Sequence, residues 1–314
     1  MRSAFAIVFA AVFTAAASFA HAEGASQPEK QPARETIGWG RMFTNDVFGD
    51  FYDRWRSSAY TVSRVSGPEW TGSLPSEFGR VLEFRLRADH ITPGILNAPA
   101  AKDRRYAGML SFGYHSHSAW RGNDLSLGAD LVLIGPQTGL SQLQDVLHDR
   151  LGLKDGAASY DSQFGNAVLF SGTGELGRTV QFGPSFGVRP FVEGQVGLEN
   201  LARAGVDVTL GNLGKSGLML REVTTGQRYS AIQNAAGKGL SLTFGGDIAA
   251  VGSSYLLPAG GAVTASKTRT RLRAGLNWQS EKSFVFFGLT HLSKEFDEQP
   301  EGQTVGSLSL LVRF

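Results

Sequence analysis

Gln144 and His148 are the residues in this 314-residue chain whose types and spacing best suit acid–base chemistry. Histidine is the side chain that most readily accepts a proton near neutral pH. The two residues are four apart within Leu140–Leu151, where leucines recur every three or four positions, so we expect a short helix with both on one flank. Two alternatives remain open. His148 could be a histidine on a helix surface, and Gln144 could belong to a capping box in which Ser141 is the N-cap.

Asn45 and Asp46 offer a second kind of chemistry, within the segment Thr44–Phe48. An amide carbonyl and a carboxylate are hard oxygen ligands of the type that Ca²⁺ takes. Adjacent Asn and Asp are also ordinary turn residues. The dipeptide therefore predicts either a Ca²⁺ site or a tight turn.

A third group of polar residues is spread over three short motifs, Asp53-Arg54, Tyr60-Thr61 and the run Asp103–Gly108, which reads DRRYAG. By composition alone, such residues are salt bridges inside a membrane barrel and tyrosines at its interfaces with the headgroups. Composition alone therefore gives these residues no catalytic or binding role.

The other histidines of the mature chain, His90, His115, His117 and His291, have no comparable setting. His115 and His117 share one face of a predicted strand and could bind a metal as a pair, but no further ligand follows in the sequence. We interpret this pair as luminal or rim histidines.

Composition and the N-terminus limit the class of protein. The chain has no cysteine, which excludes disulfides, iron–sulfur clusters and thiol catalysis. Residues 1–22 predict a secretory signal peptide with Arg2, an apolar core and an Ala20-His21-Ala22 cleavage site. The alternative is a membrane-anchoring helix, which the short apolar core disfavours. Removal of residues 1–22 deletes one arginine and no acid, and a nearly neutral mature chain does not suggest a nucleic-acid partner.

The residues between the motifs predict strands that must position them. Leu125–Leu133 alternates apolar with polar residues, and Gly135-Pro136 ends it before the helix. Gly79–Asp89 alternates in the same way, with charges at 83, 85 and 87, which suits a wet lumen. Thr179–Val188 and Leu218–Thr225 are further predicted strands.

The last residues favour a membrane barrel over a secreted β protein. Leu308, Leu310, Val312 and Phe314 lie on one face of the final predicted strand, whereas Ser307, Ser309 and Arg313 lie on the other. In lipid, every backbone polar group must be paired, and a closed barrel achieves this. We therefore expect an all-β fold, a transmembrane antiparallel β-barrel of about 12 strands that forms one domain, residues 23–314, in the outer membrane of a Gram-negative cell.

In their order along the chain, the motifs resemble those of the LpxR-like lipid A 3'-O-deacylases of the outer membrane. The family pattern has an Asn-Asp pair, a D-R…Y-T segment, a D-R-x-Y-A-G segment, an I-G-P strand end and a Q-x-x-x-H helix. The matching residues here are Asn45-Asp46, Asp53-Arg54 with Tyr60-Thr61, Asp103–Gly108, Ile134-Gly135-Pro136, and Gln144 with His148. The segment HLSKEF, residues 291–296, also resembles a late family strand. The likeness is carried by motifs between residues 40 and 165.

The resemblance implies a twelve-stranded barrel that removes the 3'-linked acyloxyacyl chain of lipid A and requires Ca²⁺. It implies that His148 is the general base that activates water. Asn45 and Asp46 would help to hold Ca²⁺, and Thr61 and Gln144 would complete the polar site. The implied partner is lipid A within lipopolysaccharide, and we expect a membrane-embedded monomer.

The chain also departs from the family pattern. A Lys-Arg pair before the D-R-x-Y-A-G segment is missing, so Lys102, Arg104 and Arg105 are the candidates to bind the substrate in its place. A tyrosine soon after the helix is missing as well, and Tyr160 lies further on. The spacing from Asp53 to Tyr60 is longer than usual in the family. These departures concern the fit of the substrate more than the base and the Ca²⁺ ligands.

Two other functions stay open from the sequence. The same barrel could hydrolyse a phospholipid or another acylated lipid. It could also be a non-enzymatic structural or transport barrel whose family site has decayed. A porin is less favoured, because the chain is short for a wide water-filled barrel.

Overall fold

The computed structural model describes residues 34–96, 99–151 and 157–312, without the side chains of residues 147–149, 151, 157, 158 and 312. The predicted signal peptide, residues 1–22, and Phe314 therefore lie outside the described residues. Within those ranges, no helix is long and apolar enough to cross a membrane.

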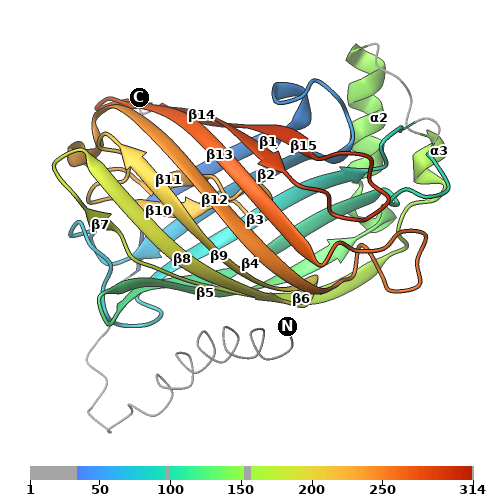
Figure 1. Ribbon diagram of the computed structural model, residues 1–314. Helices are drawn as coiled ribbons and strands as arrows, with labels where there is room; N and C mark the ends of the chain where they lie inside the picture. The colour runs from blue at the N-terminus through green and yellow to red at the C-terminus, as the bar shows by residue number, and fades with distance from the viewer. Residues whose placement is uncertain (1–33, 97–98, 152–156, 313–314) are drawn as a thin grey trace, which may run out of the picture.

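Twelve antiparallel strands form the wall of a closed barrel, as the sequence predicts (Figure 1). The ring closes where the strand at residues 167–177 pairs with the strand at residues 186–196. The wall strands are β1 (Glu35–Asn45), β2 (Trp55–Gly67), β3 (Val81–Thr92), β4 (Ala107–Trp120), β5 (Asn123–Ile134), β6 (Ala167–Gly177), β8 (Phe186–Val196), β9 (Glu199–Leu210), β12 (Gly239–Ser254), β13 (Thr268–Gln279), β14 (Ser283–Leu292) and β15 (Gln303–Val312).

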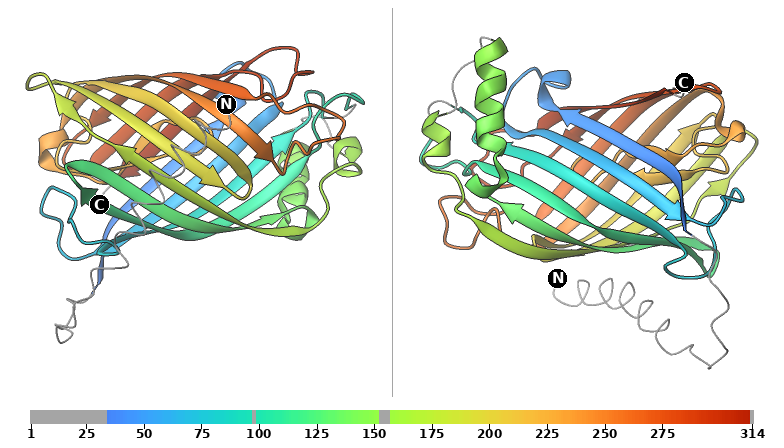
Figure 2. Two further views of the ribbon diagram at one scale, coloured as in Figure 1. Left: turned by 60° about the horizontal axis from the view of Figure 1, so that its bottom comes forward. Right: turned by 180° about the vertical axis from the view of Figure 1, so that it is seen from behind.

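The remaining elements lie in the connections between wall strands. Two of the helices, α2 and α3, stand at one end of the barrel, which we call the helix end (Figure 2). The described chain begins and finishes at the other end, which we call the termini end. The elements are η1 (Asp46–Phe48), η2 (Pro136–Thr138), α2 (Leu140–Leu151), α3 (Ala157–Tyr160), β7 (Val180–Gln181), β10 (Leu218–Arg221), β11 (Arg228–Ile232) and η3 (Ala235–Gly237).

Two predicted strands are wrong in the described chain. Thr179–Val188 contains only the two-residue β7 before a turn and the start of β8, because Gly183-Pro184 interrupts the alternation. Leu218–Thr225 is not in the wall. Its first four residues form β10, which pairs only with β11 in a separate two-stranded sheet.

Side chains along each wall strand alternate between an apolar outer face and a charged lumen. In β13, Leu272 and Trp278 are exposed on the outside, whereas Arg271 and Arg273 are buried inside. This is the reverse of a soluble protein and the pattern expected of a barrel in lipid. In β15, Leu308 and Leu310 are exposed while Ser307 and Ser309 are buried, so the predicted alternation of the last strand is confirmed for these residues.

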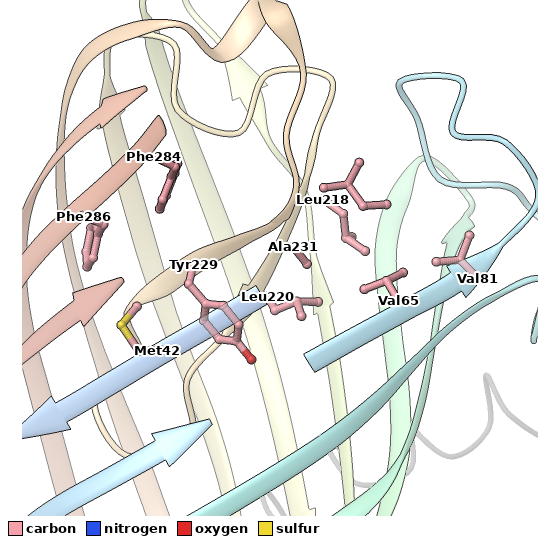
Figure 3. Close-up of a cluster of buried hydrophobic side chains, with 10 residues drawn as sticks. Met42, Val65, Val81, Leu218, Leu220, Tyr229, Ala231, Phe284 and Phe286 are labelled. Atoms are coloured by element: carbon pink, nitrogen blue, oxygen red, sulfur yellow. The ribbon is translucent and has the colours of Figure 1, made fainter. Parts of the chain in front are cut away.

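The β10–β11 hairpin lies inside the barrel near the termini end. Tyr229 and Leu220 of the hairpin pack against wall residues such as Met42 and Phe286, in a buried apolar cluster (Figure 3). A Cβ added at Gly40 would lie 2.8 Å from the Tyr229 ring, so the glycine makes room for this packing. The hairpin therefore acts as a plug, joined to the wall by apolar contacts as well as ion pairs.

Candidate functional site

Four residues of neighbouring strands form one row across the outer face of β1–β4 at the helix end. In the register of the sheet, Asn45 is opposite Ser58, Ser58 is opposite His90, and His90 is opposite Gly108. Residues directly opposite one another in a sheet project from the same face. Asp89, one residue before His90, binds Arg87 in the lumen, so the row of His90 lies on the outside.

His90 joins this row to helix α2. Its Nδ1 is 3.1 Å from Ser58 Oγ, and its Nε2 is 3.2 Å from the carbonyl oxygen of Leu140, the first residue of α2. The carbonyl can only accept, so Nε2 carries a hydrogen, and in the neutral ring Nδ1 then accepts from Ser58. The two prolines at 93 and 99 predict a loop over residues 90–102, which would begin at His90, and the sequence gives this histidine no role. That prediction is wrong, because β3 continues to Thr92.

The start of α2 packs directly on the outer face of β4. A Cβ at Gly108 would lie 3.0 Å from Thr138 Oγ1 and 3.1 Å from Leu140 Cβ, so the glycine of the DRRYAG run permits close contact. Gly135 donates its N–H to the Gly108 carbonyl and has a φ of 92°, a backbone conformation that glycine adopts without strain. These two glycines fix where α2 leaves the barrel.

The capping-box alternative for Gln144 is not supported. Ser141 lies inside α2 rather than before it, and its hydroxyl donates to Gln142 Oε1. Gln144 is buried, and its Oε1 has no hydrogen-bond partner among the described residues. A buried amide oxygen without a partner is costly, so this group is better explained by a site than by a cap.

His148 lies in α2, four residues after Gln144, in the part of the helix whose side chains are outside the description. Its role as general base therefore stays a prediction. The described part of the helix shows that α2 exists where the leucine spacing predicts it and that its first residue is bonded to the wall.

Asn45 and Asp46 lie where β1 ends and η1 begins. Asn45 Oδ1 accepts from the Val47 N–H at 2.8 Å and caps η1, so the predicted turn chemistry is present. Asp46 is buried. Its Oδ2 accepts from the Arg54 N–H at 2.7 Å, whereas its Oδ1 has no hydrogen-bond partner in the part of the chain that the structure describes.

The environment of Asp46 fits a cation. Burial raises the pKa of Asp46 to about 8, and the negative charges of Asp53 and Asp50 add to this effect. A cation beside the unpaired Oδ1 would instead favour the ionised carboxylate. Asn45 Oδ1 keeps a second lone pair beyond its cap. In the described part of the chain, no group of three or more His, Asp or Glu residues is arranged to hold a metal, so backbone carbonyls, water or substrate would have to supply the other ligands.

Thr61 does not lie in the outer row. This corrects the expectation that Thr61 completes the polar site together with Gln144. It is opposite Arg87 in the register of β2 and β3, and Arg87 binds Asp89 and Glu222 of the plug hairpin. Thr61 therefore faces the lumen. Ser58, three residues earlier in β2, occupies the outer row in its place.

Arg104 is not available to bind a substrate, which corrects a second expectation. Its guanidinium is almost completely buried and forms an ion pair with Glu295. Glu295 belongs to the connection between β14 and β15. Lys102 and Arg105 are exposed in the β3–β4 connection, and the Arg105 guanidinium lies 5.8 Å from the centre of the Phe164 ring. These two cations remain candidates for contact with a charged substrate.

Two tyrosines lie beside α2 that the sequence does not assign. The Tyr106 and Tyr160 rings meet edge to face, with centroids 4.9 Å apart. The Tyr106 hydroxyl is buried and has no hydrogen-bond partner within the described ranges. Burial raises the pKa of Tyr106, with a further contribution from the charges of Asp145 and Asp53. Tyr160 thus packs against the tyrosine of the DRRYAG run. Along the sequence, however, it comes later after the helix than the tyrosine of the family pattern.

His115 and His117 are luminal, as predicted. His115 Nε2 is 3.2 Å from Asp130 Oδ1, and His117 Nε2 is 2.9 Å from Glu83 Oε2. Each histidine has its own carboxylate partner, and both are buried.

A closed barrel that is apolar outside and charged inside, with a polar site on the outer face of its rim, defines the class as an outer-membrane β-barrel. The chain belongs to the LpxR family. The model of this family, described as "Outer membrane protein LpxR", matches residues 5–314.

Comparison with solved structures agrees on the fold. LpxR from Salmonella typhimurium superposes with a TM-score of 0.73 at 20% identity, over 88% of this chain and 100% of that one. The NanC porin and the β domain of the Bordetella autotransporter BrkA each reach a TM-score of only 0.40, at 7% and 10% identity. Both of these matches cover 88% of this chain, and they cover 100% and 98% of the other chains. No curated protein matches the sequence.

Proposed function

We propose that this chain is an outer-membrane ester hydrolase that removes an acyl chain from lipid A, the 3'-linked acyloxyacyl chain that the resemblance implies. The observation that supports it best is the attachment of α2 to the outer face of the wall, through His90 and Gly108. A site on that face opens toward lipid rather than toward the lumen. An acyl ester within the outer leaflet can reach such a site without leaving the membrane.

The proposed chemistry is hydrolysis by activated water. His148 accepts a proton from water while the water oxygen attacks the ester carbonyl, and the proton then passes to the alkoxide oxygen as the C–O bond breaks. The products are a fatty acid and a free hydroxyl on the substrate. Gln144, whose Oε1 has no protein partner, holds the water or the ester in place.

Asn45 and Asp46 would hold Ca²⁺ in this proposal, as the unpaired and buried Asp46 Oδ1 supports. When bound, the ion supplies positive charge that polarises the ester carbonyl. Lys102 and Arg105 are exposed at the same end and would pair with anionic groups of the substrate.

The proposal is tested with purified protein in detergent, given either lipid A or a phospholipid, in Ca²⁺ or in a chelator. Mass spectrometry should show that lipid A loses one acyloxyacyl chain in Ca²⁺ and stays intact in the chelator. Cleavage of the phospholipid alone would move the substrate to another lipid class. Cleavage of neither lipid would support the non-enzymatic barrel.

A further inference from the structure

A cavity of about 600 Å³ lies inside the barrel at the termini end, away from α2. Its walls include the β2–β3 connection at Trp70 and Gly72, the β4–β5 turn at Gly122, and the β6–β8 connection at Gly183 and Pro184. All of these connections belong to the termini end, so the cavity is entered from there. Its volume is within the range of roughly 300–1,000 Å³ that small-molecule sites occupy.

Cationic side chains outnumber acids around this cavity. The three carboxylates are those of Asp124, Glu175 and Glu193. The cations are Arg85, Arg178, Arg189, Lys215, Arg221 and Arg228. The cavity wall is therefore positively charged, which favours an anionic occupant.

Among the cavity arginines that are not exposed, Arg228 is the one without a carboxylate within ion-pair distance in the described chain, and the charges of Glu175 and Asp207 reach it only from farther away. Glu175 is already paired with Arg189 at 2.7 Å and with Arg221 at 2.6 Å. Asp207 is paired with Arg221 at 2.8 Å and with Arg273 at 2.7 Å. Every other arginine buried in the described lumen has a carboxylate within ion-pair distance, whereas Arg228 has none.

The hairpin places Arg228 where folding alone disfavours it. Arg228 of β11 is directly opposite Arg221 of β10, and like charges in opposite positions destabilise a two-stranded sheet. Arg221 is further fixed by the Phe191 ring, 3.7 Å below its guanidinium. A half-buried guanidinium without a carboxylate partner is costly unless something else supplies negative charge.

We infer that the luminal cavity is a binding site for a small phosphate-bearing anion from the aqueous side of the termini end, with Arg228 as its anchor. A guanidinium fork matches two oxygens of a phosphate, and this geometry is specific to arginine. The wall strands separate the cavity from lipid, so the occupant is a soluble molecule rather than a lipid headgroup. The site is independent of the proposed hydrolase site at the other end.

Inorganic pyrophosphate is the probe, titrated calorimetrically into the full barrel in detergent, against chloride at equal ionic strength. Pyrophosphate should release or absorb binding heat that chloride does not. Arg228→Gln should weaken binding at least tenfold, and Arg228→Lys should weaken it less, because the charge remains without the fork. Lys267→Gln, which removes an exposed cation at the helix end, should bind as the wild type does.

Removal of the unpaired charge should leave the barrel folded, and heat-modified migration in gels checks this for each variant. The inference is overturned if wild-type protein shows no binding at millimolar pyrophosphate, or if Arg228→Gln keeps wild-type affinity. A nanodisc comparison tests the source of the anion. Competition with pyrophosphate by phosphatidylglycerol, but not by phosphatidylcholine, would overturn the assignment of a soluble ligand.

Discussion

His90 connects the barrel wall to the helix that carries the proposed base. It accepts from Ser58 on one side and donates to the Leu140 carbonyl on the other. A hydrogen bond of this kind contributes about 1 kcal/mol to stability, which a closed barrel can lose without unfolding. A displacement of about 1 Å at a reacting group, however, can reduce a rate about a hundredfold.

His90→Phe should therefore lower kcat at least tenfold with little change in KM, because both hydrogen bonds are lost while a planar ring remains at the position. His90→Gln, which can still donate and accept, should recover part of the loss. His291→Phe is the matched control, since that histidine is exposed and lies in β14, away from α2, where its Nδ1 is 3.3 Å from Thr304 Oγ1. Wild-type kcat in His90→Phe would remove the positioning role.

Asp46→Asn should raise the Ca²⁺ concentration that gives half-maximal activity, because a neutral amide replaces the carboxylate with the unpaired oxygen. The measurement is activity against free Ca²⁺ at fixed pH. Asp297→Asn, an exposed acid of the β14–β15 connection, is the control and should leave the curve unchanged. An unaltered Ca²⁺ requirement in Asp46→Asn would place the ion elsewhere.

Among the elements, α2 depends on close contact with β4 for its position. Gly108→Val would force side-chain atoms into Thr138 and Leu140, and should displace the start of the helix. We expect activity to fall at least tenfold while the barrel still resists heat in detergent. Gly194→Val is a suitable control, because no atom lies within 4 Å of a Cβ there. Equal activity in the two variants would contradict the packing argument.

The connections at the helix end are held together by Glu295. Arg56 and Arg104, from two other elements, both contact its carboxylate. Burial alone would raise the pKa of Glu295, but Arg56, Arg104 and Arg269 outweigh burial and hold it well below its usual range. Its ionised form therefore stabilises the fold above the unfolded pKa of about 4.3, and this stabilisation is lost as the pH falls below that value.

Glu295→Gln should lower the free energy of unfolding at pH 7 by about 3 kcal/mol, which is typical of a broken buried ion pair. The difference from the wild type should narrow as the pH falls below about 4. Thermal unfolding followed by gel migration at several pH values measures this. Glu301→Gln, in the same connection but exposed and paired only with Arg54, should change little.

The sequence predicts the wall strands, the end of β5 at Gly135-Pro136 and the position of α2, because each depends on local periodicity and turn residues. It fails for Leu218–Thr225, since alternation is the same in a wall strand and in a plug hairpin. It also fails for His90, Thr61 and Arg104. Their roles depend on which strand face a residue occupies and on ion pairs between distant segments, and neither leaves a local signal.

The lumen of the barrel is blocked along its length rather than open from end to end as a pore. The plug hairpin lies across the lumen on the termini side, below the cavity that opens there. At the helix end, an apolar cluster of Trp55, Leu257, Val263 and Phe296 packs together from β2 and two connections. Ion pairs occupy much of the space between them. This arrangement leaves the outer face as the surface on which a lipid can react.

Wild-type protein should therefore show no steady ion conductance in planar bilayers. Replacement of residues 217–233 by a short Gly-Ser linker should create conductance, because the plug hairpin is removed while the wall strands remain. Gel migration confirms that the variant still forms a barrel. Steady wild-type conductance of the size seen in open porins would contradict a filled lumen.

The proposed hydrolase depends on an imidazole on α2 that activates water against an acyl ester of lipid A. The most direct measurement is mass spectrometry of lipid A from cells that produce either the wild type or His148→Ala, at equal amounts of folded barrel. We predict that one acyloxyacyl chain is lost with the wild type and retained with the variant, since a general base contributes about 10²–10⁴-fold to rate. Equal loss with both proteins, or loss with neither, would contradict it.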